Sequence, residues 1–405
     1  MSAEKSYDLV LWGATGFTGG LAADYILGAA PPSLRWAIAG RGRGKLEAVH
    51  ARLTEADAAR AAAVDILVGD AFDQESVDRV VAATRVILST AGPFIRYGTP
   101  IVDACVRFGT HYCDITGESP WVSQLIEKYH DEAAASNTHI VPFCGFDSIP
   151  FDLGAHMMAK AAESEGGLKW LEGYVRSNGS ASGGTIHTIL NLMATVPLKD
   201  MHDRVLNPPK YRDEQTPAGG RDQMWCKYDP IIGGYTAPFV MSGVNKPVVK
   251  RSEMLYRDHG TPYGKVGEFY YGEHELHKSY LSALLSTVGI AVFAFLIFFG
   301  WGRALLKKVV PSPGEGPSKE KRDKSWFKVQ FVGDTVSGRR LTGVVSGGDP
   351  GYSETAKMVS EAAICLATQE DQLKLPGGVL TAASSMGETL IERLRAANMK
   401  FEVQA

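Results

Sequence analysis

The sequence predicts an α/β fold with a parallel sheet at its N-terminus, a second α/β or α+β domain after it, and an inserted hydrophobic segment. Short apolar runs alternate with helical patterns over the first 150 residues, which is typical of a parallel sheet with helices on both faces. A glycine-rich turn joins the first apolar run to the first helix, and the regular alternation of strand and helix patterns changes after Pro150. With 405 residues, the chain is long enough for two or three domains.

The elements of the first part follow from the length and the apolar pattern of each run. The predicted strands cover Asp8–Trp12, Trp36–Ala39, Ile66–Val68, Val86–Ser89, Tyr112–Ile115 and Ile140–Phe143. The predicted helices cover Gly16–Leu27, Gly44–Ala62, Gln74–Ala82, Thr99–Phe108 and Pro120–Ser136. Since a helix follows nearly every strand, we expect the strands to be parallel.

A glycine-rich turn follows the first predicted strand and opens the first helix. Its residues are Gly13, Ala14, Thr15, Gly16, Phe17, Thr18 and Gly19. Glycines at this spacing permit a tight turn, a close approach of the backbone to a pyrophosphate, and close packing of helix on strand. The helix start then offers free N–H groups and the positive end of its dipole to the phosphates. Because strand and helix flank the turn as required, it predicts a Rossmann-type dinucleotide site rather than a plain turn.

The turn after the second strand indicates which dinucleotide binds. Proteins that bind NAD usually carry an acid there, which contacts the ribose 2′-hydroxyl. This chain has no acid at that place but three cations, Arg41, Arg43 and Lys45. A guanidinium suits a 2′-phosphate because its donors are planar and its charge is fixed. We therefore expect NADP, with Arg41 and Lys45 as contacts; a solvated basic turn is the alternative.

Two further strand ends are expected at the same site. Asp70 ends the third strand, where a carboxylate tends to lie near the adenine, although an acid before a helix is as often its cap. Thr90, Ala91, Gly92 and Pro93 follow the fourth strand, where the nicotinamide half should rest. Small residues permit the ring to approach closely there; a plain Gly-Pro turn is the alternative.

Charge and cysteine content exclude several classes of function. The net charge of −3 provides no global field that would draw the protein onto nucleic acid. The five cysteines are odd in number and form no CxxC motif, so we expect neither a disulfide framework nor a structural zinc site, and a reducing compartment fits best. His274 and His277 lack the spacing of a zinc protease, so we expect no metal site.

The region after residue 200 departs from the alternating pattern. Residues 200–265 are rich in Gly, Pro and polar side chains and are expected to form an irregular excursion, and residues 309–325 a linker. Residues 279–302 carry no charge and are long enough to reach across a bilayer. Since buried core helices are usually shorter and amphipathic, we prefer membrane contact for this segment.

Blocks along nearly the whole chain resemble one family. They are AGPFIRYGTPIVDAC (91–105), HYCDITGE (111–118), PFCGFDSIPFDLG (142–154), GGT (183–185), GDPGYSETAKMVSEAAICL (348–366) and PGGVLTAASSMGETLIERLRAANMKFEV (376–403). These blocks are similar to those of the saccharopine dehydrogenase-like oxidoreductases, which include bacterial proteins called trans-acting enoyl reductases. The chain departs from the family at Ala382, where Pro is more usual, and at Phe151, where Ser is often found.

The resemblance implies an NADP-binding Rossmann domain over residues 1–150 and a second domain over 151–350. It also implies that C-terminal helices within 351–405 return to the first domain. The apolar segment 279–302 would then lie inside one fold, with both flanks on one side of a membrane. We therefore expect a monotopic anchor on a membrane or lipid droplet, facing the cytosol, with the endoplasmic reticulum as one candidate; some eukaryotic members of the family are similarly associated.

A nicotinamide reductase needs a proton source near the carboxyl ends of its strands. We expect Tyr97, Asp114 and Asp147 as catalytic candidates, and Cys113, Glu118, Ser148 and Thr185 beside the substrate. Each has a structural alternative: Asp147 and Ser148 precede a helix with Pro in its first turn, Asp114 can bond the next turn, and Cys113 suits a core position.

Three functions stay open at this point. The preferred one is an NADPH-dependent reductase that acts on a small-molecule or lipid-like substrate at a membrane surface. The second is a reductase of an amino-acid imine, as in the true saccharopine reductases; beyond Arg96 and Arg107, the segments expected to line the pocket contain few cations to bind such a substrate. The third is a non-catalytic NADP-binding membrane protein. The sequence also leaves a homodimer open.

Overall fold

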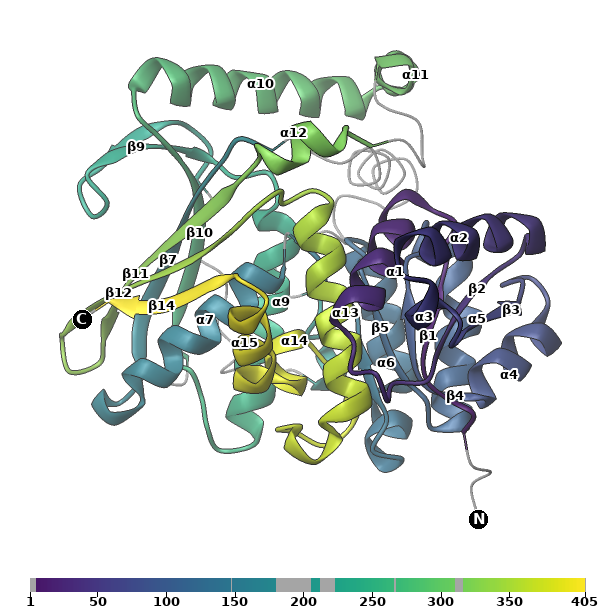
Figure 1. Cartoon of the computed structure of the whole chain (residues 1–405). Helices are drawn as coiled ribbons and strands as arrows, with labels where there is room; N and C mark the ends of the chain where they lie inside the picture. Colours follow the sequence, from purple (N-terminus) through teal and green to yellow (C-terminus); the bar gives the residue numbers. More distant parts are fainter. Residues whose placement is uncertain are drawn as a thin grey trace. The chain divides into compact units, whose positions relative to one another are not determined.

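The fold is described from a computed structural model of the 405-residue chain, which places residues 5–146, 148–179, 205–211, 223–265, 267–309 and 316–404. The chain divides into two compact units (Figure 1). The first unit comprises Met1–Phe146 and Tyr352–Ala397, and the second comprises Asp147–Gly351 and Asn398–Ala405.

The first unit contains a seven-stranded sheet in the order β13-β6-β5-β4-β1-β2-β3. Its strands are β1 (Tyr7–Trp12), β2 (Trp36–Gly40), β3 (Val64–Val68), β4 (Thr84–Ser89), β5 (His111–Asp114), β6 (His139–Val141) and β13 (Gly378–Val379). All pairs are parallel. Apart from the added β13, the order 3-2-1-4-5-6 is that of the doubly wound dinucleotide-binding fold. The predicted parallel Rossmann sheet is therefore confirmed.

Helices cover both faces of this sheet. On one face α1 (Phe17–Ala29) and α2 (Arg43–Ala56) pack beside α13 (Ser353–Thr368), and on the other α4 (Gln74–Ala82), α5 (Phe94–Phe108) and α6 (Ser119–Ala135) pack side by side. Three short helices complete the unit: α3 (Ala58–Ala61), α14 (Ala382–Ser385) and α15 (Gly387–Ala396). Burial on both faces explains why β2 reads as a continuous apolar run, since all of its residues are buried.

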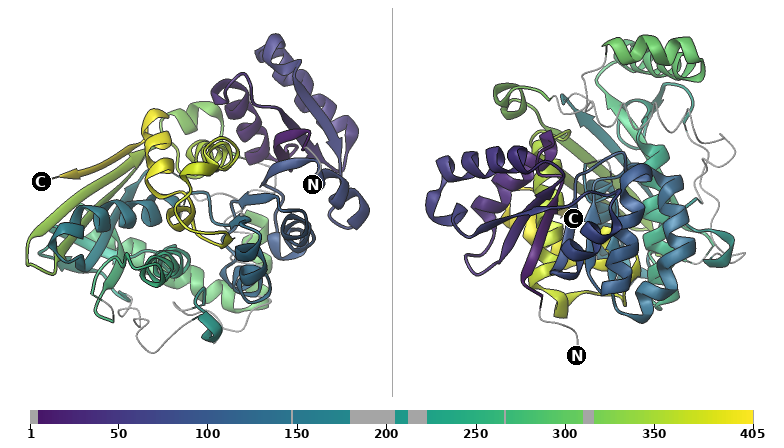
Figure 2. Two further views of the ribbon diagram at one scale, coloured as in Figure 1. Left: turned by 90° about the horizontal axis from the view of Figure 1, so that it is seen from below. Right: turned by 90° about the vertical axis from the view of Figure 1, so that its right-hand side faces the viewer.

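The second unit contains a mixed sheet in the order β14-β12-β11-β7-β10-β9-β8. Its strands are β7 (Leu168–Ser177), β8 (Lys227–Asp229), β9 (Gly234–Pro238), β10 (Tyr270–His277), β11 (Phe327–Thr335), β12 (Arg340–Gly347) and β14 (Lys400–Gln404). Among the described strands of this second sheet, only β7 and β10 pair in parallel. Helix α7 (Ile149–Ala162) packs on β7, β11 and β12, and Figure 2 shows it lying along these strands.

The structure differs from the expectation of an irregular excursion over residues 200–265. The described part contains a one-turn helix (Pro209–Tyr211), the β8–β9 hairpin and the 17-residue helix α9 (Ser242–Asp258). Helix α9 has no clear apolar periodicity in the sequence because it buries charged side chains on several sides, among them Lys246, Lys250, Arg251 and Glu253. It also contains Pro247, which argues against a helix in a sequence analysis.

Two expected boundaries also change. The linker expected at 309–325 contains the end of α11 (Gly300–Val309) and the short helix α12 (Lys319–Asp323), whose first turn is capped by the Ser318 side chain. The last strand, β14, pairs with β12 and belongs to the second unit, so residues 351–405 are divided after Ala397. An apolar pattern marks strands and helices but does not show which sheet a terminal strand joins.

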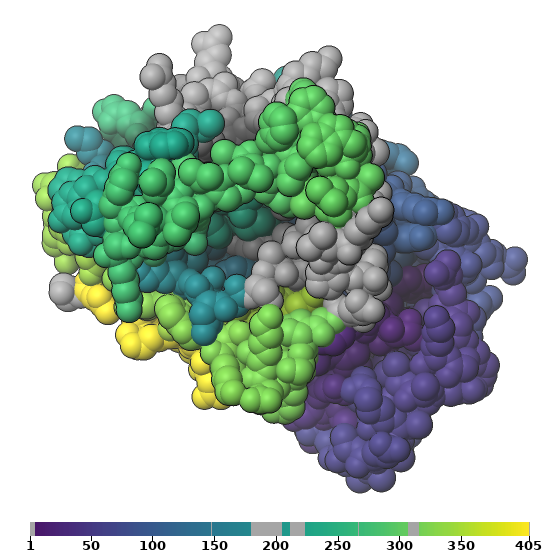
Figure 3. Space-filling view, turned by 90° about the horizontal axis from the view of Figure 1, so that it is seen from above, coloured from purple at the N-terminus to yellow at the C-terminus, as the bar shows by residue number. Residues whose placement is uncertain are grey.

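The hydrophobic segment forms helix α10 (Tyr280–Phe298), which lies between β10 and α11 in sequence. It is the one helix in the described residues that is long and apolar enough to cross a membrane. In this structure it packs along β8, β9 and β10, with Ala283 and Thr287 buried against the sheet. Figure 3 shows α10 and α11 as a ridge on the surface of the second unit.

Candidate dinucleotide-binding and active site

The glycine-rich loop joins β1 to α1, and two of its glycines are required by packing. Gly13 has φ +93°, and a Cβ there would lie 2.9 Å from Thr90 Oγ1. A Cβ at Gly19 would overlap the carbonyl oxygen of Gly13 and lie 2.7 Å from the same Thr90 oxygen. Both positions therefore exclude larger residues whether or not a ligand is bound.

Gly16 is different because its surroundings leave room for a side chain. A Cβ there would meet only the Gly13 carbonyl oxygen, at 3.4 Å, among the described atoms within 4 Å. Gly16 is also the N-cap of α1 and provides no side-chain cap for the first turn. The exposed loop thus leaves an open surface and helix N–H groups, which fits the pyrophosphate of a dinucleotide.

The loop after β4 is hydrogen-bonded to the end of β1 and to the glycine-rich loop. The Thr90 backbone N–H donates to the Trp12 carbonyl at 2.9 Å, and its hydroxyl donates to the Gly13 carbonyl at 3.2 Å. Ala91, Gly92 and Pro93 continue from there to the start of α5. The residues predicted to flank the pyrophosphate and the nicotinamide are thereby brought to one edge of the sheet.

The cations after β2 differ in how they are held. Arg43 begins α2 and donates to Glu47 at 3.0 Å, so its guanidinium is engaged on the helix surface. Arg41 and Lys45 are exposed, and Arg41 follows directly after Gly40, the last residue of β2. Arg41 is thus exposed at the place where a 2′-phosphate is expected.

Asp70 builds the turn that follows β3. Its carboxylate accepts the backbone N–H of Phe72 at 3.1 Å, and its own N–H donates to the Ser76 hydroxyl at 2.9 Å. It does not cap α4, whose N-cap is Asp73. Asp70 therefore fixes the loop and leaves the Phe72 ring 61% exposed at the carboxyl edge of the sheet.

Glu118, predicted beside the substrate, caps the start of helix α5. Its two carboxylate oxygens accept the backbone N–H groups of Phe94 at 3.0 Å and Ile95 at 2.7 Å. Glu118 is buried, and this burial raises the pKa of its carboxyl, with the two backbone N–H groups acting in the opposite direction. This cap also explains why α5 begins at Phe94, five residues before the predicted start at Thr99.

Asp114, predicted as a catalytic group, is buried and fully engaged. It accepts the Thr116 N–H at 2.9 Å, the Phe143 N–H at 3.3 Å and the Tyr112 hydroxyl at 2.7 Å. Burial raises the pKa of this carboxyl to about 7. These bonds join the ends of β5 and β6, so Asp114 holds the two strand ends together.

Cys113 occupies the core position given above as its alternative, and Tyr97 packs against a neighbouring aromatic ring. Cys113 is buried and its Sγ lies 3.9 Å from the Val359 carbonyl of α13, and burial raises the pKa of its thiol well above the usual value. The Tyr97 ring packs edge-on against Phe72, with ring centroids 5.3 Å apart, and the Arg96 guanidinium lies over both rings.

The remaining predicted residues lie in or beside the second unit. Ser148 is buried before α7, and its hydroxyl lies 3.5 Å from Asn245 Oδ1 of α9. Asn245 donates in turn to Glu273 Oε2 at 2.9 Å. Asp147 and Thr185 lie outside the described residues. Ser148 thus belongs to a buried polar chain, which the sequence missed because it did not predict α9.

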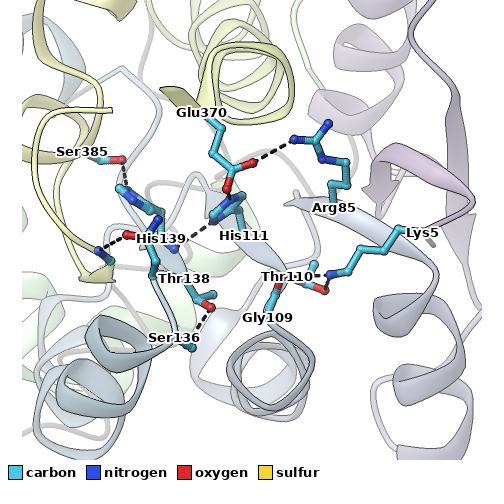
Figure 4. A network of polar contacts seen from close by, with 12 residues as sticks. Lys5, Arg85, Gly109, Thr110, His111, Ser136, Thr138, His139, Glu370 and Ser385 are labelled. Carbon is cyan, nitrogen blue, oxygen red and sulfur yellow. Dashed lines mark hydrogen bonds and ion pairs between the residues drawn. The ribbon is translucent and has the colours of Figure 1, made fainter. Parts of the chain in front are cut away.

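At the opposite, amino-terminal edge of the first sheet, a second polar network holds the returning C-terminal segment (Figure 4). The His139 backbone N–H donates to His111 Nδ1 at 3.0 Å, and His111 Nε2 lies 3.6 Å from Glu370. Glu370 also accepts from Arg85 at 2.8 Å, and the His139 ring lies 2.8 Å from the Ser385 hydroxyl. The contacts with His111, the larger cause, and with Arg85 lower the pKa of Glu370 to about 2.

The sheet order, the glycine-rich loop and the cation after β2 define a dinucleotide-binding protein of the Rossmann class. The family model "Saccharopine dehydrogenase NADP binding domain" matches residues 9–141. The chain is 34% identical to a Mycobacterium tuberculosis protein named "Putative trans-acting enoyl reductase", over 98% of this chain and 97% of that protein. It is 32% identical to the "Trans-acting enoyl reductase" of Mycobacterium ulcerans, over 97% of this chain and 96% of that protein.

A solved structure agrees with the fold. Apo saccharopine dehydrogenase (L-Glu forming) from Saccharomyces cerevisiae aligns with a TM-score of 0.54 at 14% identity, covering 98% of this chain and 99% of that one. The chain belongs to the saccharopine dehydrogenase family and is an NADP-binding reductase. When bound, NADPH would supply a hydride from its nicotinamide, and the glycine-rich loop and Arg41 are the residues predicted to hold it.

Proposed function

We propose that this reductase transfers a hydride from NADPH to the carbon–carbon double bond of a lipid-like enoyl substrate, at a membrane or lipid-droplet surface that faces the cytosol. The enoyl class is suggested by the names of the two mycobacterial relatives. The observation that supports contact with a lipid surface is the exposed apolar side of α10. Apolar stripes of this length are uncommon on surfaces that contact only water.

The exposed side of α10 is a continuous stripe. Leu281, Leu285, Val288, Val292 and Phe295 are all exposed and recur every three or four residues, so they share one side of the helix. The other side faces the sheet, where the Ser286 hydroxyl donates to Glu275 at 2.6 Å. We call the five residues the apolar stripe. A helix held to the sheet on one side and apolar on the other suits contact in the plane of a membrane.

The strands on either side of the segment support a monotopic arrangement. β10 precedes α10, β11 follows α12, and both pair with β7. Since both flanks belong to one sheet, the segment leaves and rejoins the same unit. From Arg303 to Lys328 the chain contains eight Lys or Arg and three Asp or Glu, and this excess favours an anionic leaflet such as the cytosolic one.

A second candidate function is the reduction of an amino-acid imine. The structure favours it at one point: α9 buries Lys246, Lys250 and Arg251, whereas the segments that the sequence analysis assigned to the pocket contained few cations. Arg107, one of the two cations found there, is engaged at the surface by Asp103 at 2.8 Å and by Asp78. Lysine and arginine side chains are the groups that bind the carboxylates of such a substrate.

The reaction is tested with NADPH that carries deuterium at C4 and with matched enoyl, keto and imine substrates of increasing chain length. We expect the label in the reduced enoyl product, with turnover that improves as the acyl chain lengthens. Label that appears only in amines derived from carboxylated imines would replace the proposal by the second candidate.

The surface contact is tested by vesicle flotation with anionic and neutral lipids. Val288→Glu puts a charge on the apolar stripe, and Val336→Glu makes the same change in the β11–β12 turn; the two valines are similarly exposed, at 43% and 46%. We expect the wild type and Val336→Glu to float with anionic vesicles and Val288→Glu to remain in solution. Equal flotation of both variants would contradict the role of α10.

A further inference from the structure

The carboxyl edge of the first sheet carries a group of side chains that the dinucleotide motif does not include. Phe72 follows β3, while Arg96 and Tyr97 lie in the first turn of α5. The Arg96 guanidinium carbon lies 5.6 Å from the centre of the Phe72 ring and 5.4 Å from that of Tyr97. We call these three residues the aromatic–arginine cluster.

The cluster is open to solvent although it is built mainly of rings. Phe72 is 61% exposed, and Arg96 forms no ion pair with any of the described residues. The turn beneath Phe72 is nevertheless held by Asp70 and Ser76. An aromatic ring and a guanidinium presented in this way form a surface on which a flat, π-bonded ligand can stack.

The position of the cluster indicates which part of the cofactor would meet it. The pyrophosphate belongs at the glycine-rich loop after β1, and the adenosine ribose belongs beside the residue after β2, which here is Arg41. The adenine end of the dinucleotide therefore extends toward the β2 and β3 side of the sheet. Phe72 follows β3 at this same edge, and the contacts of Arg96 and Tyr97 with Phe72 place the start of α5 beside it.

We propose that Phe72 and Arg96 bind the adenine ring of NADP by stacking, and that Tyr97 is a positioning residue that supports both. This assignment rests on the NADP cofactor and not on the identity of the reduced substrate. It also replaces the expectation that Tyr97 donates the catalytic proton. The phenol ring supplies packing against Phe72, so its hydroxyl is dispensable for this role.

The test measures binding of 2′,5′-ADP, a fragment that contains the adenine and the 2′-phosphate but no nicotinamide, by calorimetry. Phe72→Ala and Arg96→Ala are expected to weaken binding roughly ten-fold or more, in line with the loss of a base-stacking contact. Phe72→Leu keeps apolar bulk without the ring face and should weaken binding as well. Tyr97→Phe keeps the ring that packs against Phe72 and should bind the fragment like the wild type.

A matched control lies at the other end of the same helix, where the Arg107 guanidinium lies 5.0 Å from the centre of the Phe108 ring. Phe108→Ala removes the same kind of pair and should leave fragment binding unchanged. Fragment affinities of Phe72→Ala and Arg96→Ala within about two-fold of the wild type would overturn the inference, as would an equal loss in Phe108→Ala. If the wild type itself fails to bind 2′,5′-ADP, the assignment of NADP as the cofactor is contradicted. Failure of the cofactor assignment is thereby distinguished from failure of the adenine-stacking proposal alone.

Discussion

Replacing Asp114 by Asn should change how the stability of the first unit depends on pH. The buried carboxyl has a pKa of about 7 in the fold, against 3.8 for an unperturbed aspartate. A raised folded pKa means that the folded state binds the proton more tightly than the unfolded chain. The stabilising contribution is therefore fully present below about pH 4 and is lost as the pH rises through about 7.

The size of the effect follows from the shift. About three pKa units correspond to about 4 kcal/mol in the free energy of unfolding, at roughly 1.4 kcal/mol per unit. Asp114→Asn cannot titrate, and its amide can still accept the Thr116 and Phe143 N–H groups. Relative to this variant, the wild type should thus lose about 4 kcal/mol of stability between pH 4 and pH 7.

The assay is urea unfolding of both proteins between pH 4 and pH 8, followed by the fluorescence of tryptophans in the first unit. Trp12, Trp36 and Trp121 are buried there, so they report its unfolding. The lowered pKa of Glu370 has the opposite sign, because its contribution is lost as the pH falls toward about 2, but it is common to both proteins and cancels in the difference. A difference that stays constant from pH 4 to pH 8 would refute the buried, proton-binding role of Asp114.

Two further predictions concern the dinucleotide edge. Glu118→Gln replaces one of the two acceptor oxygens by an N–H donor that faces the start of α5. The protein should therefore lose about 1.5–3 kcal/mol of stability in thermal or urea unfolding. An unchanged melting temperature would contradict the capping role of Glu118. Gly19→Ala should destabilise the first unit, because its Cβ overlaps the Gly13 carbonyl, whereas Gly16→Ala should change stability by less than about 0.5 kcal/mol and still weaken NADP binding measured by calorimetry. The reverse pattern would show that the two glycines have been assigned the wrong roles.

The parts of the fold that could be predicted from the sequence are those determined by residues close to one another along the chain. Most strands of the first sheet are largely buried on both faces, the edge strand β3 excepted, so each appears as a short apolar run between helices. The glycine-rich loop is also local, since Gly13 and Gly19 are required by the turn between β1 and α1. The family model agrees with this part and supports NADP as the cofactor.

The roles of the acids depended on partners that are distant in sequence. Glu118 was predicted beside the substrate, but its carboxylate meets N–H groups 23 and 24 residues earlier. Asp114 was expected either to catalyse or to bond the next turn, and it also accepts from Phe143, 29 residues later. An acid at the end of a strand looks the same in sequence whether it faces a ligand or a backbone amide. Helix α9 was missed because its buried face carries lysines and an arginine, which do not produce an apolar pattern.

The central claim is that this protein binds NADP through the loop after β1 and the cation after β2. Calorimetric titration of the wild type and Arg41→Ala with NADP⁺ and NAD⁺ tests it most directly. We predict that the wild type prefers NADP⁺ by at least about ten-fold, and that Arg41→Ala loses most of this preference while its affinity for NAD⁺ stays the same, because a charge-assisted contact to the 2′-phosphate is worth about 1.5–3 kcal/mol. Equal affinities of the wild type for the two cofactors would contradict the account.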